Sequence, residues 1–194
     1  MYKSPFFHFF ICFSRYTISQ LGRTDMKTII VYYSRRDENW VDGEVRKLEV
    51  GNTERIADYI QEATNGELFP LVLKKPYSSD YETCVAQAQN DQFAKAEREL
   101  LSYPDLSSYD VVYLGYPIFW EDLPSPVISF LKHADLKGKT IYPFSTHEGS
   151  GLGASISHIK DLAKGADVKD PLPIPGSLVS KARNRVKNWV EKHQ

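Results

Sequence analysis

The chain has 194 residues, of which 42% are hydrophobic and 25% charged, which is enough for one domain with a well-buried core. Its 24 basic and 25 acidic residues give a formal net charge of -1, which argues against a nucleic-acid partner held by bulk electrostatics. The two cysteines, Cys12 and Cys84, form no C-x-x-C motif and indicate neither a disulfide framework nor a metal site. This cysteine usage fits a reducing cytoplasm.

The first 25 residues differ from the rest, because five of the ten Phe residues fall between positions 6 and 13. This apolar run is too short to span a bilayer, and no small-x-small cleavage site follows it. Met26 stands directly before the first predicted strand. We therefore expect residues 1–25 to be an N-terminal extension outside the fold, and residues 26–194 to form one domain without a membrane segment.

Strand and helix patterns alternate along the rest of the chain. In chain order they predict a strand at 27–33, a polar insertion at 37–50, a helix at 52–64, a strand at 67–73, a helix at 81–101, a strand at 110–115, a helix at 125–133, a strand at 139–145, a helix at 151–163, a weak strand at 168–174 and a helix at 177–193. Within the insertion, Asp42-Gly43 predicts a hairpin. Pro171 and Pro173 place the weak strand at a sheet edge, and Ser177 is the expected cap of the last helix.

This alternation predicts an α/β fold. We expect a three-layer sandwich, in which helices cover both faces of a five-stranded parallel sheet. In such sheets a ligand binds beyond the carboxyl ends of the strands, at the point where the strand order reverses. The residues that follow the strands are therefore the candidates for function.

The first strand ends at Ser34, and after the insertion Gly51-Asn52-Thr53 opens a helix. Small polar residues at a helix N-terminus can bind a phosphate through backbone N–H groups. A plain helix cap is the alternative interpretation. Arg35 could add positive charge to the phosphate, or it could be solvated at the start of the insertion.

The second candidate segment follows the central strand and consists of Pro117, Ile118, Phe119 and Trp120. Aromatic rings on such a loop can sandwich a flat conjugated ligand. The alternative is that the two aromatic side chains fold back over the core. The acidic pair that follows, Glu121-Asp122, favours a surface loop and therefore a site.

The third candidate segment is rich in glycine, which lets the backbone approach a ligand closely. Its N–H groups can bind carbonyl oxygens or a negative ring. The neighbouring polar side chains of His147 and Glu148 could stand at the mouth of the pocket. The alternative is that they are simply exposed to solvent. The candidate residues of this segment are Ser145, Thr146, His147, Glu148, Gly149 and Gly151.

Together, the Gly-Asn-Thr, Tyr-Pro-Ile-Phe-Trp and Ser-Thr-His-Glu-Gly-Ser-Gly segments resemble those of the flavodoxin-like family, from about Met26 to the end. The chain is most similar to a bacterial subgroup that carries an insertion in the phosphate loop. The resemblance implies the strand order 2-1-3-4-5 and a non-covalently bound FMN. It implies that the first segment holds the phosphate, the second packs against the flavin ring, and the third meets the polar edge of the ring.

The resemblance favours an electron carrier that exchanges electrons with a redox partner protein in the cytoplasm. An NAD(P)H-dependent quinone or flavin reductase on the same fold is the alternative. A signalling receiver domain is disfavoured, because Ser34 and Gly115-Tyr116 stand where it needs acidic residues for Mg²⁺. Three features depart from the family's pattern: the interruption at 35–50, the absence of glycine from 117–123, and a charge less acidic than that of typical carriers.

Overall fold

The computed structural model describes residues 26–193, so the predicted extension at 1–25 lies outside the described residues. Its main sheet is parallel and has the order β4-β1-β5-β6-β7, with β8 also paired to β6. The strands are β1 (Thr28–Tyr32), β4 (Glu67–Pro70), β5 (Val111–Pro117), β6 (Thr140–His147), β7 (Asp167–Val168) and β8 (Leu172–Pro175). Since β7 and β8 are two halves of one edge strand, the predicted fold class and strand order are confirmed.

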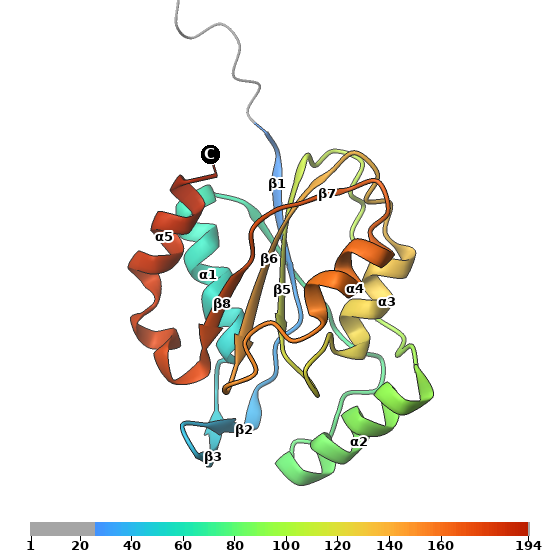
Figure 1. Cartoon of the computed structure of the whole chain (residues 1–194), viewed down its shortest axis with the longest axis vertical. Helices are drawn as coiled ribbons and strands as arrows, with labels where there is room; N and C mark the ends of the chain where they lie inside the picture. Colours follow the sequence, from blue (N-terminus) through green and yellow to red (C-terminus); the bar gives the residue numbers. More distant parts are fainter. Residues whose placement is uncertain (1–25, 194) are drawn as a thin grey trace, which may run out of the picture.

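Helices cover both faces of this sheet (Figure 1). The pair α1 (Asn52–Thr64) and α5 (Arg183–Glu191) covers one face, and the pair α3 (Ser125–His133) and α4 (Ser155–Leu162) covers the other. Successive β1 side chains alternate between two cores, with Ile29 and Val31 in one and Ile30 and Tyr32 in the other. No helix in the described range is long and apolar enough to cross a membrane.

The edge strand contains one extra residue relative to its neighbour. Val168 pairs with Ile141, whereas Leu172 pairs with Phe144, so four steps along the edge match three steps along β6. The interruption includes Pro171, which has no N–H to contribute to the ladder. For this reason the last predicted strand is observed as two short pieces, at the edge as expected.

Two helices are shorter than predicted because the backbone turns left-handed at their ends. The helix α2 (Tyr81–Ala94) ends before the predicted position 101, since Lys95 has a φ of 49°. The helix α4 begins at Ser155, because Gly151 and Gly153 before it have φ values of 64° and 49°. Both glycines therefore belong to the loop after β6 and not to the helix.

The last predicted helix is observed as two elements. A 3-10 helix, η1 (Gly176–Lys181), comes first, and α5 begins at Arg183. The prediction that Ser177 caps the helix is wrong, because this residue lies inside η1. The residue that precedes α5 is Ala182, which has no side chain able to cap it.

The insertion forms the predicted hairpin. Its strands β2 (Asp37–Val41) and β3 (Glu44–Leu48) are antiparallel, and the turn residues Asp42 and Gly43 have φ values of 53° and 85°. Two left-handed residues are what a tight type I′ hairpin turn requires. The hairpin lies at the carboxyl ends of the parallel strands, and α2 extends from the same end of the molecule (Figure 1).

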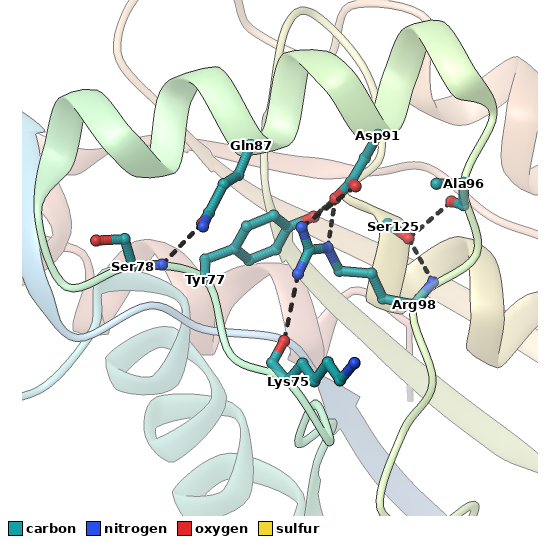
Figure 2. A network of polar contacts seen from close by, with 8 residues as sticks. All are labelled: Lys75, Tyr77, Ser78, Gln87, Asp91, Ala96, Arg98 and Ser125. Carbon is teal, nitrogen blue, oxygen red and sulfur yellow. Dashed lines mark hydrogen bonds and ion pairs between the residues drawn. The ribbon is translucent and has the colours of Figure 1, made fainter.

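A polar network fixes α2 to the rest of the fold (Figure 2). The Tyr77 hydroxyl donates to the Asp91 carboxylate at 2.6 Å, and Arg98 pairs with the same carboxylate at 2.5 Å. The Arg98 guanidinium also lies 4.1 Å from the centroid of the Tyr77 ring. Ser125 accepts from the Arg98 backbone N–H and donates to the Ala96 carbonyl. The network thus ties the loop before α2 and the segment after α2 to α2 itself, and ties the segment after α2 to the start of α3.

This network predicts a measurable loss of stability when its shared carboxylate is removed. In Asp91→Ala, the buried Tyr77 hydroxyl loses its acceptor, and we expect the free energy of unfolding in urea to fall by about 1–3 kcal/mol. Glu99→Ala is the matched control, because Glu99 pairs with Lys74 at the exposed surface. That change should cost less than about 1 kcal/mol. Equal losses in the two variants would contradict the assigned role of the network.

Candidate functional site

The carboxyl ends of the central strands border a cavity of about 350 Å³. All three segments predicted from the sequence contribute to its lining. Asn52 and Thr53 come from the first, residues 117–120 from the second, and residues 146–148 from the third. The three segments that the sequence singles out therefore line one hollow.

The N-terminus of α1 offers free hydrogen-bond donors to this cavity. Gly51 precedes the helix, and a Cβ there would collide with the Ser34 hydroxyl, so the position requires glycine. Ser34 Oγ accepts the N–H of Glu54 at 3.0 Å. Within residues 26–193, no hydrogen bond engages the amides of Asn52 and Thr53. Two donors and the positive end of the helix dipole are thus available to an anion.

Arg35 also lines the cavity, but its donors are engaged elsewhere. The guanidinium donates to the backbone carbonyls of Glu38, Ser78 and Ser79 at distances between 2.6 and 3.1 Å. These bonds hold the hairpin to the loop before α2. The predicted contact of Arg35 with a phosphate therefore has no support in this geometry, and its role is that of a clamp.

The second segment forms a strained turn. Phe119 and Asp122 exchange two backbone hydrogen bonds of 3.0 Å, and the residues between them, Trp120 and Glu121, have φ values of 47° and 60°. Each left-handed non-glycine residue costs about 1–2 kcal/mol. The Trp120 indole N–H donates to the Val85 carbonyl of α2 at 3.1 Å, which helps to hold the turn. The indole lines the cavity and stays 43% exposed.

The third segment connects the other two through one residue. The hydroxyls of Thr146 and Thr53 are 2.8 Å apart, and both side chains are buried. The Thr146 carbonyl accepts the N–H of Ile118 at 2.9 Å. Its neighbour Ser145 is fully buried, does not line the cavity, and has a hydroxyl without a partner in the described part of the chain.

Glu148 links the third segment to the hairpin. Its carboxylate accepts the N–H of Asp42 at 3.2 Å. A Cβ on Gly176 would occupy the position of this carboxylate, so a larger residue there would displace the Glu148 side chain. Burial raises the pKa of Glu148, and burial together with Arg185 lowers the pKa of His147. Both shifts favour the neutral form of a group partly withdrawn from water.

The cavity brings together most of the residues predicted from the sequence. Those that line it are Arg35, Asn52, Thr53, Pro117, Ile118, Phe119, Trp120, Thr146, His147 and Glu148. The other predicted residues, Ser34, Gly51, Ser145, Gly149 and Gly151, are their neighbours along the same three loops. Ser34 and Gly51 lie at the N-terminus of α1, where the Ser34 hydroxyl accepts the Glu54 N–H and Gly51 packs against Ser34.

One wall of the cavity is formed by residues outside the three strand-end segments, and it was not predicted from the sequence. The hairpin contributes Asn39 and Trp40, and α2 contributes Tyr81, Cys84, Val85 and Ala88. The four α2 positions follow the spacing i, i+3, i+4, i+7, which identifies one face of a helix in the sequence. That spacing does not say what the face packs against. Ser150 and Gly176 also line the cavity without having been predicted.

Comparisons with known proteins point to one family. A family model described as flavodoxin matches residues 48–193, a range that begins at the end of the hairpin. No curated protein sequence matches the chain.

Solved structures share the fold. A candidate flavoprotein from Bacteroides eggerthii is 26% identical, with a TM-score of 0.67, and the match covers 86% of this chain and 96% of that one. A candidate flavoprotein from Bacteroides uniformis is 24% identical over 86% of this chain and 98% of its own, with a TM-score of 0.65. A flavoprotein from Lactobacillus acidophilus, solved in complex with FMN, is 23% identical, with a TM-score of 0.58. The match covers 80% of this chain and 97% of that one.

The contact between the two threonines predicts a coupled loss of stability. Thr53→Val leaves the buried Thr146 hydroxyl without its partner, and we expect the free energy of unfolding to fall by about 1–2 kcal/mol. The double variant Thr53→Val, Thr146→Val removes both polar groups, so its loss should be smaller than the sum of the two single losses. Urea unfolding of the four proteins measures this difference. Strictly additive losses would show that the two hydroxyls do not interact.

Proposed function

Since the chain belongs to the flavodoxin family, we propose that it binds FMN non-covalently in this cavity and passes electrons through the flavin. The observation that carries the proposal is the convergence of the three strand-end segments on one hollow. One segment offers free amides at a helix N-terminus, one offers aromatic side chains, and one offers polar groups. These are the three chemistries that a phosphate, a flat ring and the polar edge of that ring require.

The residues present fit FMN at the phosphate end. The backbone amides of Asn52 and Thr53 have no other partner in the described chain, and Gly51 lets Ser34 and the Arg35 carbonyl pack closely against the start of α1. An anion at this position would complete the first turn of α1. The Lactobacillus acidophilus flavoprotein of similar fold was solved with FMN, which supports the same cofactor here.

When bound, FMN supplies the one- and two-electron chemistry, and the protein fixes its position and electrostatic surroundings. Trp120 and Phe119 would pack against the ring, and Thr146 and His147 would border its polar edge. A carboxylate near the ring opposes the negative charge gained on reduction and lowers the reduction potential. Glu148 is the carboxylate that lines the cavity, and its effect grows as the pH rises through its raised pKa.

A reductase is the second candidate, and the hairpin is the observation that favours it. A carrier that docks to a partner protein needs an accessible flavin edge, whereas here the hairpin and α2 add a wall to the same cavity. Such a wall suits a small substrate beside the ring. The chain's mild acidity also gives little electrostatic support for docking to a basic partner.

The proposed cofactor predicts a simple titration. FMN added to the apoprotein at micromolar concentration should lose its fluorescence with a stoichiometry of one, because the aromatic side chains quench a stacked ring. Riboflavin, which lacks the phosphate, should bind at least roughly tenfold more weakly, because it leaves the α1 amides unpaired. Unchanged FMN fluorescence in this titration would sink the proposal.

The phosphate position predicts the effect of one added charge. Asn52→Asp is nearly isosteric and places a carboxylate at the α1 N-terminus, where acidic residues are tolerated by the helix. We expect FMN to bind roughly tenfold more weakly, since like charges repel across a few ångströms near a protein surface. Riboflavin provides the control, and its affinity should not change. Equal losses for the two flavins would place the phosphate elsewhere.

The choice between carrier and reductase predicts two different kinetic results. A reductase with FMN bound should oxidise NADPH or NADH continuously when a quinone is supplied as acceptor. A carrier should be reduced only when a separate flavoprotein reductase is added. Absorbance at the nicotinamide band, followed with and without that added reductase, distinguishes the two.

A further inference from the structure

A second cavity, of about 360 Å³, lies between α2, α3 and α4. Ala88 and Phe119 line both this cavity and the one assigned to FMN, and the turn at residues 119–122 separates the two. Apart from Phe119, none of its lining residues belongs to the three strand-end segments. This hollow, called the α2–α4 cavity below, therefore has no part in the proposed FMN site.

The polar network around Asp91 forms one side of the α2–α4 cavity. Four members of this network line the cavity, namely Tyr77, Asp91, Ala96 and Ser125 (Figure 2). The Tyr77 hydroxyl is bonded to Asp91, and the Ser125 hydroxyl is bonded to the Ala96 carbonyl. These bonds fix the end of α2 relative to the start of α3. A wall that is fixed before binding costs a ligand little extra ordering.

The turn at residues 119–122 and α4 form another side of the cavity. The Asp122 carboxylate accepts the N–H of Leu123 at 2.7 Å, and its second oxygen lies 2.9 Å from Nδ1 of His158 on α4. The Glu121 carbonyl accepts the N–H of Ala154, just before α4, at 2.7 Å. These contacts hold the turn against the start of α4, so this side is also formed in advance.

Most of the surface inside the cavity is apolar. The side chains that supply it come from the turn, the loop before α3, and both helices; they are Phe119, Leu123, Pro124, Ile128 and Leu162. Phe119, Ile128 and Leu162 are only partly buried against the core. The Tyr77 ring meets the Phe119 ring edge to face, with centroids 5.8 Å apart. An apolar ring in this space would remove further apolar surface from water, which favours binding.

The charged groups that line the cavity are paired, with one exception among the described residues. Arg98 neutralises Asp91, and Lys132 pairs with Glu97 at 3.0 Å. The carboxylate of the turn is engaged as described above. Within residues 26–193, the ammonium group of Lys95 lines the cavity and pairs with no carboxylate. A ligand carboxylate would therefore meet an available cation beside acidic groups that are already neutralised.

The backbone fixes the position of Lys95. This residue ends α2 in a left-handed conformation, with a φ of 49°, and its N–H is bonded to the Gln92 carbonyl at 3.1 Å. Glycine or asparagine is the usual residue in this conformation at a helix end, because a longer side chain adds steric cost. The cap sets the direction in which the lysine side chain leaves the helix, toward the cavity that it lines.

We propose that the α2–α4 cavity binds a small amphipathic monoanion, in which one or two conjugated rings carry a single carboxylate. The rings lie against Phe119, and the carboxylate pairs with the Lys95 ammonium. A volume of about 360 Å³ is near the lower end of the range for ligand pockets and suits a molecule of this size. The site is separate from the proposed flavin site, and its ligand does not require FMN to bind.

The test measures binding of 2-naphthoate to the full chain by calorimetry, first alone and then with FMN in excess. The uncharged isostere 2-naphthamide is the comparison ligand. We expect naphthoate to bind roughly fivefold more tightly than naphthamide, because the carboxylate gains one partly exposed ion pair. High salt should reduce this preference, since it screens the ion pair. FMN should leave both affinities unchanged.

The variant Lys95→Asn removes the ammonium and keeps a residue that tolerates the left-handed conformation. Naphthoate should bind to it roughly fivefold more weakly, whereas the affinity for naphthamide should not change. The matched control is Lys160→Gln, which removes the same charge from an exposed position on α4 that does not line the cavity. Both ligands should bind to this control as they bind to the unaltered protein.

Three results would overturn the site. One is that naphthoate does not bind, and another is that Lys95→Asn binds naphthoate as tightly as the unaltered protein does. The third is that excess FMN displaces naphthoate, which would place the ligand in the flavin cavity. Failure of FMN itself to bind, in contrast, overturns the proposed function alone. The comparison of Lys95→Asn with the unaltered protein still tests the site in that case, because Lys95 does not line the flavin cavity.

Discussion

The guanidinium of Arg35 joins the inserted hairpin to the loop before α2, and the architecture of the cavity follows from this clamp. Its bonds reach the carbonyls of Glu38, Ser78 and Ser79, groups far apart in the chain. A guanidinium can make several such bonds because its five donors diverge in one plane. With the hairpin fixed in this way, Trp40 meets Tyr81 and the cavity gains its apolar wall.

The opposite side of the cavity depends on the parallel sheet. Because β1, β5 and β6 run in the same direction, the loops that follow them leave the sheet at its carboxyl end. Thr146, at the end of β6, bonds to Thr53 of the first segment and to Ile118 of the second. These short buried contacts fix the three loops relative to one another and to the core. A ligand that requires all three loops therefore finds them already arranged.

The parallel sheet and the three loops could be predicted, because hydrophobic alternation and punctuation by glycine and proline are local properties of the sequence, whereas the strand order was implied by the resemblance to the flavodoxin-like family. The hairpin at Asp42-Gly43 could be predicted for the same reason. The α2 wall could not, since the spacing of Tyr81, Cys84, Val85 and Ala88 shows a helix face but not its neighbour. The role of Arg35 also depended on tertiary contacts, because its partners are backbone carbonyls that have no sequence signature.

The proline-rich edge of the sheet has a consequence for self-association. In β8 the Pro173 carbonyl accepts a hydrogen bond from the Arg185 side chain of α5, and proline has no N–H to offer to another strand. An exposed strand edge normally acts as a template on which another chain can add a strand. Here that position presents neither a donor nor a free acceptor. At this position the margin of the molecule is therefore poorly suited to pairing with a strand of another chain.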